Sequence, residues 1–279
     1  MAENFMRFPL GKTKALTLSY DDGVEQDIRL IEIMKTYGLK GTFNINTGRY
    51  SPEGTTFPPG YVQRVMTKKQ ANELYLNSGM EIAVHTLSHP HLEGMAENVC
   101  AYEVLMDRKN IEDEYGVITR GMAYPYGTYN DSVVSTLKQC GISYARTTVS
   151  TEKFDLPTDW LRLPATCHHR NKRLMELALK FVESKVERAP LLFFLWGHSY
   201  EFEQHDNWDV IEKFAEYIGN REDIWYATNI EIYDYIAAYK QLQFSVDGKK
   251  IYNPTATTLY FARNNKLFSI RSGETIIIA

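Results

Sequence analysis

Short apolar runs alternate with longer amphipathic stretches from about residue 15 to about residue 240, and this alternation limits the fold more than any other feature of the chain. Strands that are connected through helices run parallel, because each helical crossover returns the chain to the same end of the sheet. Seven apolar runs of this kind predict an α/β fold, a deformed (β/α)7-type barrel that is closed or nearly closed. The predicted strands cover residues 15–20, 42–46, 80–85, 121–124, 142–146, 191–195 and 224–228.

The predicted helices carry readable start signals. Thr67, followed three residues later by Gln70, predicts a capping box for a helix that starts at residue 68. Asn229 is expected to cap a helix that starts at Ile230. The chain therefore specifies the first turn of at least two helices.

The last part of the chain has a different pattern. After about residue 244 the helical spacing disappears, and turn signals such as Asp247-Gly248 and Asn264-Asn265 separate short runs. This pattern predicts a small C-terminal β appendage. We expect two domains: a catalytic barrel over residues 1–243, and a small β extension over residues 244–279 that packs on or beside it.

Composition excludes several classes of protein. The 279 residues carry a net charge of −4, and their lysines and arginines form no basic stripe, so we expect no nucleic-acid partner. The longest strongly apolar run, residues 191–196, is too short to cross a membrane, and the N-terminus has no apolar leader. Three cysteines without paired spacing fit a reducing compartment, so a cytoplasmic protein is expected, although a secreted chain without its leader would look the same.

Two motifs that follow predicted strands supply carboxylates and imidazoles. Asp21 and Asp22 end the strand at 15–20, and His85 and His89 follow the strand at 80–85. The carboxyl ends of parallel strands converge on one face of a barrel. Asp22, His85 and His89 are then a one-carboxylate, two-histidine ligand set for one divalent ion, with Zn²⁺ expected first and Co²⁺, Ni²⁺ and Mn²⁺ as alternatives. Asp21 can take a proton from water that the ion activates.

With these motifs the chain resembles the polysaccharide deacetylases, carbohydrate esterase family 4, which have the NodB-type deformed (β/α) barrel. The resemblance covers about residues 14–239 and is based on Ser19-Tyr20-Asp21-Asp22-Gly23 and His85-Thr86-Leu87-Ser88-His89-Pro90. It implies that Asp21 is the general base and that Asp22, His85 and His89 bind the metal.

The third family motif, Arg-x-Pro-Tyr, aligns with Ala123-Tyr124-Pro125-Tyr126, and here the chain departs from the family. The arginine that orients the base is replaced by Ala123. Arg146 or Arg162 could supply the missing charge from a neighbouring strand end. The resemblance implies that the backbone N–H of Tyr126 stabilises the oxyanion and that Pro125 and Tyr126 contact the substrate.

The remaining motifs lie further along the chain. Asp155-Leu-Pro-Thr-Asp159-Trp160 resembles the fourth motif, whose aspartate supports the catalytic histidine and whose tryptophan lines the acetyl pocket. Trp196-Gly197-His198 matches the fifth motif, so His198 is the expected general acid, and Trp160 and Trp196 are expected to bind substrate. The adjacent pair His168 and His169 either lines the rim of the site or consists of ordinary loop residues.

The expected function is therefore that of a metal-dependent carbohydrate deacetylase, a hydrolase acting on non-peptide carbon–nitrogen bonds. Its substrate would be an N-acetylated amino-sugar oligomer or polymer or a related small amide. Two alternatives remain: a hydrolase of cyclic ureides or formamides on the same barrel, and a catalytically impaired carbohydrate-binding relative. The sequence leaves the oligomeric state open.

Overall fold

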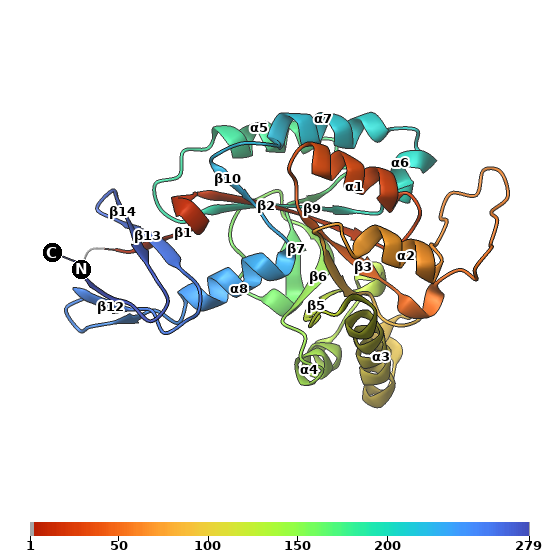
Figure 1. Ribbon diagram of the computed structural model, residues 1–279, viewed down its shortest axis with the longest axis horizontal. Coiled ribbons are helices and arrows are strands. Elements are labelled where there is room, and N and C mark those ends of the chain that lie inside the picture. Colours follow the sequence, from red (N-terminus) through yellow and green to blue (C-terminus); the bar gives the residue numbers. More distant parts are fainter. Residues whose placement is uncertain (1–2, 279) are drawn as a thin grey trace.

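A computed structural model describes residues 3–278 (Figure 1). Its main sheet has nine strands in the order β7-β6-β5-β4-β3-β2-β9-β8, with β10 paired to β2, and each of these pairings is parallel. The strands are β2 (Lys14–Asp21), β3 (Gly41–Ile45), β4 (Glu81–Val84), β5 (Gly121–Ala123), β6 (Tyr144–Ser150), β7 (Leu163–Ala165), β8 (Cys167–His168), β9 (Leu191–Gly197) and β10 (Ile224–Tyr226).

One continuous segment closes this sheet into a ring. Residues 163–165 pair with β6, and residues 167–168 pair with β9 at the opposite edge. Between them, the N–H of Thr166 donates a 2.8 Å hydrogen bond to the carbonyl of Phe194. The ring is deformed at β2. The first residues of β2 pair with β10, and only its later residues pair with β3. The predicted deformed (β/α) barrel is therefore confirmed, and β7 and β8 add to the seven predicted strands.

Two apolar cores follow from the alternation of side chains along the strands. Leu16, Leu18 and Tyr20 of β2 join the core between the barrel and its outer helices. Ala15 of β2 belongs to a second core, which continues through the last helix into the C-terminal strands. The helices are α1 (Asp27–Thr36), α2 (Lys68–Tyr75), α3 (Glu97–Tyr115), α4 (Asp131–Gln139), α5 (Leu174–Glu183), α6 (Tyr200–Gln204), α7 (Trp208–Ile218) and α8 (Asn229–Tyr239).

The capping predictions have different outcomes. Thr67 and Gln70 form the expected capping box of α2. For α8 the prediction was wrong by one residue, because Thr228 is the N-cap and forms a capping box with Glu231. Asn229 instead points into the barrel, where its Oδ1 accepts a 2.8 Å hydrogen bond from Thr17.

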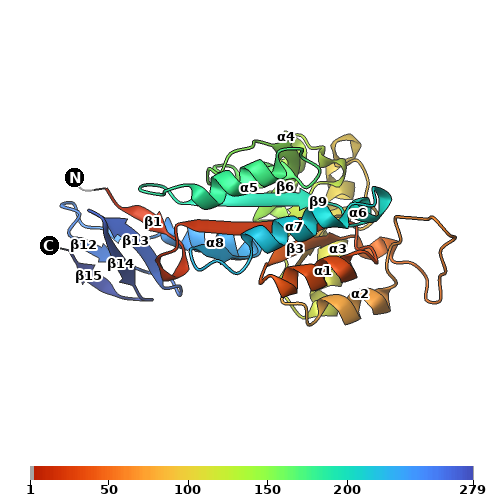
Figure 2. The same ribbon diagram turned by 90° about the horizontal axis from the view of Figure 1, so that it is seen from above.

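The C-terminal strands form two small antiparallel sheets, β1-β13-β14 and β11-β12-β15. They lie beyond α8 at one end of the molecule, whereas the long loop before α2 projects from the other end (Figures 1 and 2). Strand β1, from the N-terminus, pairs with β13, which the sequence did not predict. The division at residue 243 stays a prediction. The strands are β1 (Phe5–Arg7), β11 (Gln243–Phe244), β12 (Lys250–Tyr252), β13 (Leu259–Arg263), β14 (Lys266–Ile270) and β15 (Thr275–Ile277).

None of the helices within residues 3–278 combines the length and the apolar character that a membrane-spanning segment needs.

Candidate active site

Polar side chains from three strand ends meet in one pocket at the carboxyl end of the barrel. Asp21 ends β2 and Asp22 follows it, His85 follows β4, and His198 follows β9. The parallel register places these ends on the same face. The pocket has a volume of about 430 Å³ and is lined by Asp21, Asp22, Arg49, Gln63, His85, His89, Tyr124, Tyr126, Gly127, Thr148, Trp196, His198 and Tyr200.

Asp22, His85 and His89 converge in this pocket. Oδ1 of Asp22 lies 3.7 Å from Nε2 of His85 and 3.6 Å from Nε2 of His89. These separations are too long for hydrogen bonds, but they suit atoms that share an ion, since ligands about 2.1 Å from a tetrahedral Zn²⁺ stand about 3.4 Å apart. Oδ1 is buried and has no hydrogen-bond partner within residues 3–278. The three residues therefore fit a divalent metal ion.

Neighbouring groups fix the orientation of two of these residues, His85 and Asp22. Nδ1 of His85 lies 2.8 Å from the carbonyl oxygen of Ala123, which can only accept, so Nδ1 carries the proton and the lone pair of Nε2 points into the space between His85 and Asp22. The amide of Gln63 donates to Oδ2 of Asp22 at 2.9 Å. Asp107 of α3 accepts a 3.0 Å hydrogen bond from the backbone N–H of His85. The ligand geometry is therefore supported from three separate elements.

The backbone of the site is unusual as well. Asp22, Thr86, His89 and Tyr126 have φ values of 81°, 67°, 62° and 58°, in the left-handed region that residues with a Cβ seldom adopt. Asp22 can therefore turn away from Asp21, although the two are adjacent in the chain. Strained residues of this kind concentrate where a side chain must point in one particular direction.

Arg146 supplies the charge that is missing at Ala123. It is paired with Ala123 across the β5–β6 register, and its guanidinium forms a buried ion pair with Asp21. It also lies 4.5 Å from the ring centroid of Trp196. The alternative, Arg162, instead pairs with Asp159 at 2.8 Å and with Asp131 at 2.6 Å.

The ion pair controls the protonation of Asp21. Burial by itself would raise the pKa of this carboxyl, but the charge of Arg146 and the neighbouring His85 and His198 outweigh it and lower the pKa to about 2. Asp21 is therefore ionised at neutral pH and can accept a proton.

His198 lies beside this ion pair. Its Nε2 is 3.8 Å from Oδ2 of Asp21, and its Nδ1 is 3.6 Å from Oε2 of Glu201. Burial would lower the pKa of His198, but Glu201, Asp21 and Asp22 together raise it above its usual value. Sequence reasoning gave Glu201 no catalytic assignment, although its position three residues after His198, in α6, was a usable signal.

Tyr126 and Trp196 both line the pocket, where the sequence expected substrate contacts. Tyr126 lies in the turn Pro125–Gly127, is 56% exposed, and has its ring 4.5 Å from that of His89. Pro125 is buried and is outside the pocket lining, so of the two neighbouring residues expected to contact substrate only Tyr126 lines the pocket.

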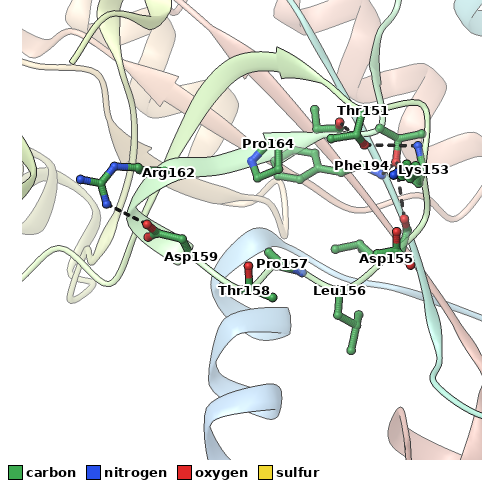
Figure 3. Close-up of a pocket in the computed structure, with 13 residues that line it drawn as sticks. Thr151, Lys153, Asp155, Leu156, Pro157, Thr158, Asp159, Arg162, Pro164 and Phe194 are labelled. Carbon is green, nitrogen blue, oxygen red and sulfur yellow. Dashed lines mark hydrogen bonds and ion pairs between the residues drawn. The ribbon is translucent and has the colours of Figure 1, made fainter. Parts of the chain in front are cut away.

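The structure contradicts the expected place of Trp160 in the site. Trp160 starts a short helical turn before β7, so it lies at the amino end of a parallel strand, opposite Asp22, His85 and His89. Its ring packs edge-on against Tyr233 of α8, with the centroids 5.1 Å apart. Asp155 and Asp159 line a different cavity of about 300 Å³, shown in Figure 3 with Arg162 beside Asp159. The fourth motif is therefore absent from the active-site pocket.

His168 and His169 do approach the site, through Glu201. The Nε2 atoms of both rings lie 3.1 Å from Oε2 of Glu201. His169 is buried and stacks with its centroid 5.7 Å from that of Tyr20. Neither histidine lines the pocket itself, so the first of the two alternatives, a position at the rim, is not found, and both histidines contact the site only through Glu201.

The sequence has relatives of known description. The sequence model of the family described as polysaccharide deacetylase matches residues 10–145. Chitin deacetylase 1 of Cryptococcus neoformans var. grubii serotype A is 29% identical over 127 residues, which make up 45% of this chain and 24% of that protein. The chain thus spans about a quarter of the length of this curated relative.

Two solved structures share the fold. A family 4 carbohydrate esterase from Streptomyces lividans, solved with acetate, has a TM-score of 0.50 at 15% identity and covers 77% of this chain and 92% of its own. A family 4 acetyl xylan esterase from Clostridium thermocellum, solved with a cobalt ion, has a TM-score of 0.50 at 14% identity, with 79% and 90% covered. At these identities the likeness concerns the fold alone. Residues 10–145, just under half of the chain, thus match the polysaccharide deacetylase family, the chain resembles a chitin deacetylase, and the barrel is shared with family 4 carbohydrate esterases.

Proposed function

We propose that this protein is a metal-dependent hydrolase that removes the acetyl group from N-acetylated amino sugars. The observation that carries the proposal is the convergence of Asp22 Oδ1 with the Nε2 atoms of His85 and His89, beside an ionised Asp21. Two imidazoles and one carboxylate suit Zn²⁺ first, with Co²⁺, Ni²⁺ and Mn²⁺ as alternatives. When bound, the ion would act as a Lewis acid and lower the pKa of water.

In the proposed reaction, a water oxygen bonds to the acetyl carbonyl carbon, and the bond from that carbon to the sugar nitrogen breaks. Asp21 accepts the proton of the attacking water, and Arg146 keeps this carboxylate ionised and oriented. The N–H of Tyr126 would donate to the developing oxyanion. His198 would donate its Nε2 proton to the departing nitrogen, so the products are acetate and an amine.

A carbohydrate substrate is supported by aromatic rings in the pocket lining and in the segments that supply lining residues. Tyr126 is exposed beside His89, and its ring stacks on His91 with the centroids 3.9 Å apart. In the loop that supplies Gln63, Phe57 and Tyr61 stack at 5.4 Å with an interplanar angle of 2°. Flat aromatic faces with polar edges suit the apolar faces and hydroxyl groups of sugar rings.

The test is acetate release from N-acetylglucosamine oligomers. Activity should disappear with a chelator and return with added Zn²⁺ or Co²⁺, and Asp22→Ala should be inactive under each ion. Turnover by the metal-free protein would exclude the proposed mechanism. A panel of formylated and cyclic amides tests the other bonds that this barrel could hydrolyse, and binding of sugar without turnover would identify an impaired enzyme.

A further inference from the structure

Three imidazoles surround one carboxylate oxygen next to the proposed active site. Oε2 of Glu201 lies 3.1 Å from Nε2 of His168, 3.1 Å from Nε2 of His169 and 3.6 Å from Nδ1 of His198. The Glu201 side chain is only 12% exposed, and its Oε2 atom is buried without a well-aligned hydrogen bond in the described part of the chain. Burial would raise the pKa of Glu201, but the three imidazoles hold it well below its usual range.

The same atoms could suggest a second metal site, because His168, His198 and Glu201 present ligand atoms within 4.8 Å of one another. The tautomer of His168 argues against this. The backbone N–H of Arg170 donates to Nδ1 of His168 at 3.1 Å, so Nδ1 holds a lone pair and Nε2 of the neutral ring holds the proton. A protonated nitrogen cannot bind a metal. His168 therefore presents an N–H to Glu201.

His169 faces the carboxylate from the other side, and its close approach depends on Gly197. A Cβ at position 197 would lie 2.1 Å from Nδ1 of His169, so a larger residue would displace this ring. Gly197 is also the residue that joins β9 to His198. The local sequence thus places His169, Glu201 and His198 in one packed unit.

We propose that Glu201 is the positioning residue of His198, and that it performs the role that the sequence assigned to the aspartate of residues 155–160. This inference rests on the proposed function. Glu201 faces Nδ1, so it favours the tautomer with its proton there and leaves Nε2 directed towards Asp21. As the carbon–nitrogen bond of the substrate breaks, the proton on Nε2 of the imidazolium moves to the departing nitrogen, and Glu201 stays ionised throughout.

The distance of 3.6 Å between Nδ1 and Oε2 suits a pair that shortens in the reactive complex, since catalytic hydrogen bonds are often long before substrate binds. His168 and His169 keep the carboxylate in place until then. Asp159 has no access to His198, because it lies at the amino end of β7 and pairs with Arg162.

Two substrates with different leaving groups test this role. An N-acetylglucosamine oligomer releases an amine that must be protonated, whereas 4-nitrophenyl acetate releases a stable phenolate that needs no proton. Glu201→Gln should lower kcat on the oligomer about 100-fold with little change in KM, and should change kcat on the ester less than about threefold. Glu201→Asp should recover part of the lost activity. Glu216→Gln, the same charge change on an exposed position of α7, is the control.

An equal loss on both substrates would overturn the inference, because it would mean that Glu201 supports the whole site rather than proton donation. Full oligomer activity in Glu201→Gln would overturn it as well, while leaving the proposed function intact. If the wild-type protein hydrolyses the ester but no acetylated amine, the proposed function fails first. Two bound ions per chain in the wild-type protein, falling to one in Glu201→Gln, would show that the cluster is a metal site.

Discussion

A half-buried carboxylate at one end of the barrel and a buried carboxylate at the other end are bonded differently. At the amino end, Glu81 accepts hydrogen bonds from the N–H of Ile230 at 2.9 Å and from the hydroxyls of Tyr144 and Thr42, each at 2.8 Å. At the carboxyl end, Oδ1 of Asp22 is buried with no such partner inside residues 3–278. Satisfied polar groups hold a fold together, whereas acceptors that converge without donors indicate where a cation or a substrate binds.

This comparison separates stability from activity. Apart from the buried Asp21–Arg146 ion pair, changes at the carboxyl end should mainly affect turnover, because the polar groups there are arranged for a ligand. Changes at the amino end should mainly affect the free energy of unfolding, because their polar groups bond to one another. Variants that break this division would show that the two ends are coupled.

The largest effect is expected for Asp22→Ala. Asp22 is proposed to hold the ion together with two histidines. Its loss should remove several kcal/mol of transition-state stabilisation, which corresponds to a loss of about a thousandfold in kcat/KM. Circular dichroism should show an unchanged fold, and a chelator should lower the Tm of the wild-type protein but not of the variant, since only a protein that binds the ion is stabilised by it. A Tm that responds equally to chelator in both proteins would place the ion elsewhere.

Arg146→Met should affect both activity and stability. It leaves the carboxylate of Asp21 buried without its cation, which costs about 3 kcal/mol of unfolding free energy and raises the pKa of Asp21. Denaturant unfolding and the pH profile of acetate release should both shift.

Because Ala123 is the cross-strand neighbour of Arg146, the double variant Ala123→Arg with Arg146→Ala can test this ion pair. Recovery of activity in the double variant would show that Asp21 needs a guanidinium, and that either β5 or β6 can supply it. No recovery would show that the position on β6 itself matters.

Glu81→Gln should have a moderate and pH-dependent effect. Partial burial raises the pKa of Glu81 from 4.5 to about 7, although its three donors oppose this. A raised pKa stabilises the folded protein at low pH, and this contribution is lost as pH rises through about 7. The unfolding free energy of the variant relative to wild type should therefore increase between about pH 5 and pH 8. Acetate release should stay near the wild-type rate; a large loss would contradict the division between the two ends.

Trp160→Phe should have the smallest effect. The shorter ring loses part of its edge-on contact with Tyr233, which should lower the unfolding free energy by about 1 kcal/mol. KM for acetylated oligomers should not change, because Trp160 is remote from the metal ligands. A several-fold rise in KM would contradict this and would show that Trp160 contacts the substrate, as its motif suggests.

The sequence was sufficient where function depends on residues close together in the chain. Asp21-Asp22 and His85 to His89 each follow or end a strand, and parallel strands bring their ends together, so the convergence of Asp22, His85 and His89 could be predicted from their places in the chain. The barrel followed from the alternation of runs for the same reason.

The sequence was insufficient where function depends on register. Whether Arg146 or Arg162 replaces the missing arginine is decided by the pairing of β5 with β6, which the intervening helix leaves open. Trp160 was misplaced because β7 was not among the seven predicted strands, and a residue before a parallel strand lies at the opposite end from a residue after it. A role for Glu201 could not be predicted from the sequence, because it depends on the packing of His168 and His169 around its carboxylate.

The segment that closes the ring has a consequence for how the protein becomes active. Residues 163–165 and 167–168 join the two edges of the sheet; His168 is the last residue of that junction, and His169 follows it directly. The histidines can reach Glu201 only once β6 and β9 are held together, so barrel closure and maturation of the catalytic centre are one folding event. Contacts between residues distant in the chain form slowly, and regain of turnover after dilution from denaturant should therefore follow the slowest refolding phase.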